Sequence, residues 1–108
     1  MKLGDIILIP FPFAELTNIK VRPAVVITET ADIYKDLVVS AISSVVPRQL
    51  NHREIFIEAN NINNLRVDSI IKTDRIITLK KEDKIADLGS LSNTEIAEFK
   101  SVLVRMVE

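Results

Sequence analysis

An arginine held next to a proline is the clearest candidate for chemistry in this chain. Arg22 precedes Pro23, and proline forces the residue before it toward extended backbone, so we expect Arg22 at a boundary between a loop and a strand. A guanidinium fork fixed there can bridge two oxygens of a phosphodiester and stabilise the charge that develops on them. The alternatives are a solvated loop arginine or an ion pair with Glu15 or Asp74.

Hydroxyl and carboxylate groups supply the other candidates, because the chain has no cysteine and a single histidine. The lack of cysteine excludes disulfides, thiolate chemistry and Cys-type zinc sites. His52 alone offers too few soft ligands for a transition-metal site and does not form a Ser-His-Asp arrangement. We therefore expect no metal and no cofactor.

The overall charge argues against a general nucleic-acid coat protein. Lys and Arg number 14 against 15 Asp and Glu, and the formal net charge is −1. A surface that binds nucleic acid must then be local, and a second copy of the chain could complete it. One candidate is the segment 47–53, in which Arg48, His52 and Arg53 could contact backbone and bases; a solvated hairpin is an equal alternative.

The pattern of apolar residues predicts a mainly β fold in one domain spanning 1–108. With 108 residues the chain is long enough for one core, and it has no run near the ~20 apolar residues that cross a bilayer, so we expect a cytoplasmic protein without membrane contact. The run Ala24–Ile27 predicts a strand buried on both faces, and the asparagine-rich stretch 60–64 predicts a turn or short helical connection. Strands are expected near residues 5–10, 23–29, 36–46, 54–58, 68–72, 75–79 and 84–89.

A helix is expected to start after Ser92, since Ser92 and Glu95 have the spacing of a capping box. An apolar stripe at spacings of three and four indicates that this helix covers one face of the core. Three valines widen the apolar surface enough to permit dimer contact as well. The stripe comprises Ile96, Phe99, Leu103 and Met106, and the valines are Val102, Val104 and Val107.

Three segments together resemble the MazF/PemK family of toxin endoribonucleases. The first runs from Gly4 to Phe13 and continues, after a polar loop, from Lys20 to Ile27 with the Arg-Pro pair. The second is the serine-interrupted strand 38–46, and the third is 68–79 with its Lys-Thr-Asp sequence. This resemblance extends over nearly the whole chain and is most specific in the first 27 residues.

The resemblance implies roles for particular side chains. Family members commonly place a threonine or serine beside the arginine, and Ser43 matches this position best, with Ser44 as the second choice. Such a hydroxyl can hold a phosphate in line for attack. Lys72 and Asp74 lie two residues apart, so both project from the same face of an extended chain. Asp74 could assist proton removal or simply fix a turn.

Glu15 and Lys20, which precede Arg22 in the chain, are further candidate site residues. Family members often carry an acidic residue a few positions before it, whereas residues 17–19 are Thr-Asn-Ile here. Glu15 is the nearest carboxylate and is a weak candidate for the general base. Lys20 is a candidate for RNA contact, together with Ser44, Lys72 and the basic residues of segment 47–53.

The implied fold is an SH3-like barrel of curved, mostly antiparallel strands with a C-terminal helix. The implied protein is a homodimer that cleaves single-stranded RNA without a metal, through attack by the ribose 2′-hydroxyl. A cognate antitoxin would cover the RNA groove, and DNA would be bound only by the toxin-antitoxin complex. Two alternatives stay open: a relative of the same fold that inhibits growth by binding DNA gyrase, and a member without catalysis that only binds RNA or antitoxin.

Overall fold

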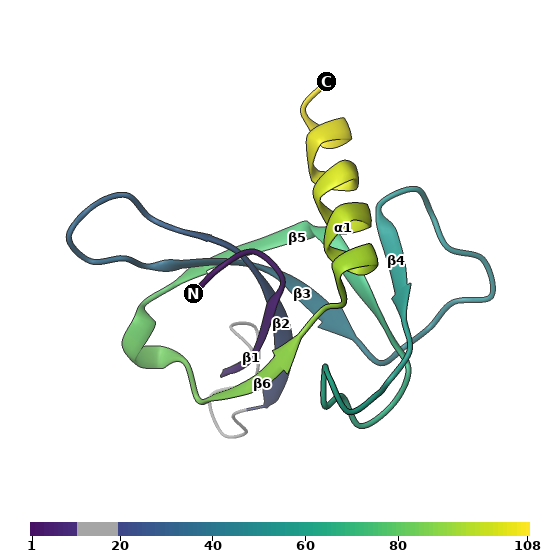
Figure 1. Cartoon of the computed structure of the whole chain (residues 1–108), viewed down its shortest axis with the longest axis horizontal. Helices are drawn as coiled ribbons and strands as arrows, with labels where there is room; N and C mark the ends of the chain where they lie inside the picture. Colours follow the sequence, from purple (N-terminus) through teal and green to yellow (C-terminus); the bar gives the residue numbers. More distant parts are fainter. Residues whose placement is uncertain (11–19) are drawn as a thin grey trace.

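In the part of the chain that the structure describes, six strands form one antiparallel sheet that curls into a half-barrel, and one α-helix follows the last strand (Figure 1). The structure is a computed structural model and describes residues 1–10 and 20–108. Across the sheet the strands run in the order β4-β5-β3-β2-β1-β6. The mainly β fold with a C-terminal helix is therefore confirmed. The strands are β1 (Asp5–Pro10), β2 (Val21–Glu29), β3 (Leu37–Ser43), β4 (Glu54–Ile57), β5 (Ser69–Leu79) and β6 (Ala86–Ser90), and the helix is α1 (Asn93–Met106).

The central strands are buried on both faces, as their continuous apolar sequences predict. In β2, Val25 belongs to a core cluster beneath α1, together with Phe99 of the helix. Its neighbours Ala24 and Val26 belong to a second cluster, with residues from β1 and β3. All three β2 side chains are fully buried. Alternating side chains thus supply both cores from one strand.

β5 corrects the expectation of two separate strands at 68–72 and 75–79. It is one strand of 11 residues with an irregularity in its pairing, because Ala41 of β3 pairs with Lys72 whereas Ser40 pairs with Ile76. The three residues between them have no partner on β3 and bend the strand. The buried Thr73 holds this bend, since its hydroxyl donates to the carbonyl of Arg53 at 2.6 Å and its own carbonyl accepts from the Ser40 hydroxyl at 3.0 Å.

The start of α1 agrees with the expected capping box. The backbone N–H of Glu95 donates to the Ser92 hydroxyl at 3.2 Å, and the N–H of Ser92 donates to the Glu95 carboxylate at 2.8 Å. Phe99 is fully buried, as the stripe predicts. The expectation that Val102 widens the apolar outer surface is wrong, because Val102 is 4% exposed and packs in the core. No helix of the described chain has the length and apolarity needed to cross a membrane.

The tip of the β2–β3 hairpin is held by a carboxylate. Asp32 accepts hydrogen bonds from the Thr30 hydroxyl at 2.8 Å and from the backbone N–H groups of Tyr34 and Lys35 at 3.1 and 3.3 Å. The Thr30 hydroxyl is the main cause that lowers the pKa of Asp32, and the two backbone groups add to it. The ordered tip carries Ile33 and Tyr34 into solvent, with 87% and 68% of their surfaces exposed.

Candidate active site

A hollow of about 680 Å³ opens beside Arg22 and is a candidate site. Arg22 is the second residue of β2 and pairs with Ile9 of β1. The sequence suggested a position just before the strand, whereas the structure places Arg22 inside it. The strand begins earlier because Val21 already pairs with Pro10. Most of the wall is apolar and is formed by Leu8, Val21, Pro23, Ile42, Leu65, Val67 and Leu88.

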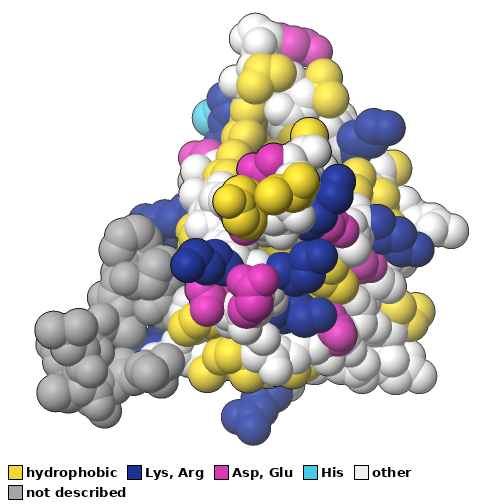
Figure 2. Space-filling model, turned by 90° about the vertical axis from the view of Figure 1, so that its left-hand side faces the viewer, with side chains coloured by type: hydrophobic (Ala, Val, Ile, Leu, Met, Phe, Trp, Pro, Cys, Tyr) yellow, Lys and Arg dark blue, Asp and Glu magenta, His cyan; other side chains and the backbone are white. Residues whose placement is uncertain are grey.

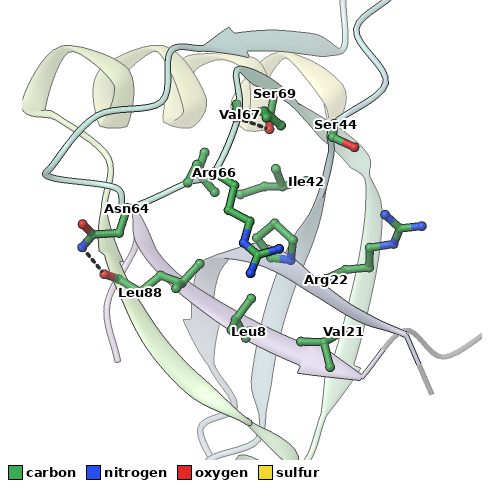
Figure 3. Close-up of a pocket in the computed structure, with 12 residues that line it drawn as sticks. Leu8, Val21, Arg22, Ile42, Ser44, Asn64, Arg66, Val67, Ser69 and Leu88 are labelled. Carbon is green, nitrogen blue, oxygen red and sulfur yellow. Dashed lines mark hydrogen bonds between the residues drawn. The ribbon is translucent and has the colours of Figure 1, made fainter.

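The polar part of the wall combines two guanidinium groups with hydroxyl and amide groups. These residues are Arg22, Ser44, Asn64, Arg66 and Ser69. Arg66 reaches across the hollow from the opposite loop, whereas Arg22 and Ser44 lie at its other rim (Figure 3). Among the described residues that line the hollow two are basic and none is acidic, although the net charge of the chain is −1.

Of the two serines at the end of β3, Ser44 lines the hollow that Arg22 also lines. Ser43 is the last residue of β3, and its hydroxyl accepts a hydrogen bond from the backbone N–H of Val45 at 3.1 Å, which closes the end of the strand. Ser43 does not line the hollow, whereas Ser44 does. Because neighbouring side chains of an extended chain point to opposite faces, Ser44 lies on the same side as Ile42, which also lines the hollow.

The Lys72–Asp74 pair lies outside this hollow. Both residues belong to β5, at the bend around the buried Thr73; Lys72 is half-buried and pairs with Glu54 of β4, and Asp74 is exposed. Lys20 is exposed and directly precedes β2. Glu15 lies outside the residues that the structure describes.

The basic segment 47–53 also lies apart from Arg22. Arg48 is exposed, and His52 and Arg53 line a second, smaller hollow of about 390 Å³ together with Val102 and Arg105 of α1. This segment is tied to the bend of β5 through the Arg53 carbonyl, which accepts hydrogen bonds from the N–H and the hydroxyl of Thr73. Of the residues proposed for RNA contact, Ser44 lines the hollow beside Arg22, whereas His52 and Arg53 line the smaller one.

No sequence pattern indicated Arg66 as a site residue, because its position over the hollow depends on the fold of the preceding loop. Asn63 is fully buried, and its side chain satisfies three backbone groups: it accepts from the N–H groups of Asn60 and Leu65 at 3.1 and 3.0 Å and donates to the Glu58 carbonyl at 2.9 Å. The asparagine-rich stretch indicated a turn, which is confirmed. The asparagine-rich sequence gave no indication of which strand this turn packs against.

The loop rests on β6 at a glycine. The N–H of Ser90 donates to the Ile62 carbonyl at 3.2 Å, and the Asn64 side chain donates to the Leu88 carbonyl at 2.6 Å. Between these contacts lies Gly89, where an added Cβ would overlap the Ile62 carbonyl oxygen. The absence of a side chain at Gly89 thus permits the contact that brings Arg66 over the hollow.

Charge elsewhere on the surface is mixed. On the face that carries the β2–β3 hairpin tip and the short 3₁₀ helix η1 (Lys81–Asp83), Lys and Arg side chains lie among Asp and Glu side chains (Figure 2). Lys84 pairs with Asp87 at 2.9 Å, as one example near this face. Within residues 1–10 and 20–108 no group of three or more His, Cys, Asp or Glu side chains could hold a metal ion.

Comparison with known proteins gives the family. Residues 2–107 match the model of the PemK-like, MazF-like toxins of type II toxin-antitoxin systems. No curated protein matches the chain. Among solved structures, an endoribonuclease in complex with its cognate antitoxin from mycobacterial species has the same fold, with a TM-score of 0.74 at 13% identity over 99% of this chain and 94% of that chain. The match over almost the full length shows that the chain belongs to the PemK-like, MazF-like family of type II toxins.

Proposed function

We propose that this toxin is a metal-independent endoribonuclease that cleaves single-stranded RNA. The observation that carries the proposal is the position of Arg22, on a paired strand at the rim of an apolar hollow that also contains the Ser44 hydroxyl. A rigid strand positions a guanidinium more accurately than a loop does, and pre-positioned donors contribute strongly to catalysis. Single-stranded RNA suits such a hollow, because its unstacked bases can be splayed onto apolar walls.

The reaction is an internal transesterification. The ribose 2′-oxygen attacks the adjacent phosphorus, the P–O2′ bond forms, and the P–O5′ bond breaks. Arg22 stabilises the charge on the phosphorane oxygens and donates the proton that the leaving O5′ requires. A serine hydroxyl, Ser44 in this geometry or Ser43 by family resemblance, holds the phosphate in line. Asp74 and Glu15 are the weak candidates for the base that removes the 2′-hydroxyl proton.

The first expected result concerns the metal and the products. Purified protein should cleave a defined single-stranded RNA in the presence of EDTA, since the donors named above complete the reaction without a Lewis acid. The products should carry a 2′,3′-cyclic phosphate and a 5′-hydroxyl, which mass spectrometry distinguishes from other ends. Strict dependence on added Mg²⁺ would contradict the mechanism. A preparation of Arg22→Ala purified in the same way serves as the control for contaminating nuclease.

The second expected result concerns assembly as a homodimer. Several large apolar side chains remain exposed, including Val104 and Val107 near the end of α1 at 49% and 83%, and Val45 at 76%. Exposed apolar groups of this kind are typical of surfaces that a partner covers. Light scattering at micromolar concentration should give twice the 12.1 kDa mass of the chain. A mass of one chain would contradict the dimer.

Inhibition by a cognate antitoxin completes the proposal. The family is defined by toxins that act with an antitoxin. The apolar hollow beside Arg22 offers a groove that a peptide can occupy, which would block access of RNA to the arginine. Binding of DNA is then a property of the complex with antitoxin and not of this chain alone.

A further inference from the structure

Arg66 has a geometry that its sequence context did not reveal. Its two neighbours are both held by side chains: the N–H of Leu65 donates to Asn63 at 3.0 Å, and the carbonyl of Val67 accepts from the Ser69 hydroxyl at 2.9 Å. A third bond, from the N–H of Ala59 to Asp68 at 2.9 Å, closes the loop that contains Arg66. The backbone of Arg66 is therefore fixed although its side chain is exposed.

The side chain of Arg66 is available for a ligand. Within residues 1–10 and 20–108 the structure gives its guanidinium no hydrogen bond and no ion pair, and it extends over the hollow toward the β2 side (Figure 3). The wall around it is mainly apolar. The hollow thus has the guanidinium of Arg66 above an apolar wall and the guanidinium of Arg22 at the other rim. This arrangement suits a ligand in which negatively charged groups alternate with flat apolar groups.

A single-stranded oligonucleotide has this alternation, since phosphates occur at each nucleotide with a base between them. We propose that Arg66 binds a second phosphate, adjacent to the one at Arg22, and that the base between the two phosphates packs on the apolar wall. The inference rests on the proposed endoribonuclease function for its substrate class. It makes Arg66 a substrate-binding residue that sets the register of the strand, because two guanidinium groups carried by fixed stretches of backbone favour one alignment of the phosphates.

Arg66 is a candidate for RNA contact that the sequence did not suggest. None of the basic residues of segment 47–53 lines this hollow, so Arg66 is the one cation besides Arg22 among the described residues that line it. Its charge should therefore contribute to affinity directly.

Salt dependence of binding tests this inference. The probe is a sequence-randomised single-stranded 2′-deoxy oligonucleotide, which lacks the attacking hydroxyl and cannot be cleaved. Arg66→Ala should weaken its binding by about tenfold or more, because a hydrogen-bonded charge is removed. It should also lower the slope of log affinity against log salt by about 0.7, the contribution of one phosphate contact to a single strand.

Two further variants separate charge from structure. Arg66→Lys should keep the salt slope but recover only part of the affinity, because an ammonium cannot form the planar fork. Arg75→Ala removes an exposed arginine of β5 that does not line the hollow, and should change neither quantity. An unchanged slope and affinity in Arg66→Ala, or an equal loss in Arg75→Ala, would overturn the inference. So would an absence of binding by the unmodified chain.

The two proposals fail in different ways. If the chain cleaves RNA and Arg66→Ala binds normally, the second phosphate site is wrong and the endoribonuclease function stands. If binding depends on Arg66 but RNA is never cleaved, the site stands and the catalytic proposal is wrong. In cleavage assays, Arg66→Ala should raise the half-saturating RNA concentration more than it lowers the saturating rate.

Discussion

Arg22→Ala is expected to lower single-turnover RNA cleavage by a factor of roughly 10²–10³ or more, the scale observed when one pre-positioned donor is removed. In the proposed mechanism Arg22 acts mainly on charge that develops in the transition state, so RNA affinity should fall far less than the rate. The measurement compares single-turnover cleavage with filter binding of a non-cleavable 2′-deoxy strand. Circular dichroism confirms that the variant is folded.

Arg22→Lys serves as the matched variant. It keeps the positive charge but cannot span two phosphate oxygens with a planar fork, so it should restore little of the rate. Full cleavage by Arg22→Ala would contradict the catalytic role. It would favour the gyrase-binding or non-catalytic alternatives and leave Lys72 and Asp74 as the remaining catalytic candidates.

The two serines at the end of β3 can be separated in the same assay. Family resemblance favours Ser43, whereas the structure places Ser44 in the hollow with Arg22. Each alanine variant should be milder than Arg22→Ala, because the hydroxyl positions the phosphate and does not carry the main charge stabilisation. A larger effect of Ser44→Ala would assign the positioning role to Ser44. Ser43→Thr should be nearly silent, since either hydroxyl can accept from the Val45 N–H.

Gly89→Ala is expected to have the largest effect on stability. Its Cβ would overlap the Ile62 carbonyl oxygen and come within 3.1 Å of the Ile62 carbonyl carbon and 3.2 Å of that of Asn63. These are backbone atoms of a loop held by a buried asparagine, so they cannot move aside without loss of hydrogen bonds. We expect a loss of about 3 kcal/mol or more in the free energy of unfolding, from overpacking and unsatisfied backbone groups together.

Thermal unfolding measures this loss, and Tm should fall by more than about 10 °C. Asn61→Ala changes an exposed residue of the same loop and should lie within about 0.5 kcal/mol of the unmodified chain. A Gly89→Ala variant with unchanged Tm would show that the loop shifts without cost. Because the same loop carries Arg66, the alanine variant should also bind the 2′-deoxy strand more weakly at temperatures where it remains folded.

Local patterns predicted the elements that depend on local interactions. The capping box at Ser92 and Glu95 placed the start of α1 because both of its hydrogen bonds lie within four residues. Burial on both faces of β2 followed from an unbroken apolar run. The position of Arg22 near the start of a strand followed from Pro23, although pairing with β1 extends that strand two residues farther than expected.

Features that depend on distant contacts were not predictable. The polar sequence Thr73-Asp74-Arg75 suggested a turn, and β5 continues through it because the Thr73 hydroxyl bonds to the Arg53 carbonyl, 20 residues away. Arg66 joins the site only because its loop rests against Gly89, and no local pattern connects these two positions. Val102 was assigned to the outer surface because the helical stripe alone does not show how far β4 and β5 wrap around α1.

The pairing of β1 with β6 determines when the hollow can form during synthesis of the chain. The hollow takes Leu8 from the first strand and Leu88 from the last, and the N–H of Ile85 donates to the Leu8 carbonyl at 2.9 Å. Contacts between such distant parts of a chain form late, because a long loop must close first. A nascent chain on the ribosome therefore lacks one wall of the hollow until its final strand has emerged. The endoribonuclease activity proposed above requires the complete hollow, so a chain that stops before β6 is expected not to cleave RNA.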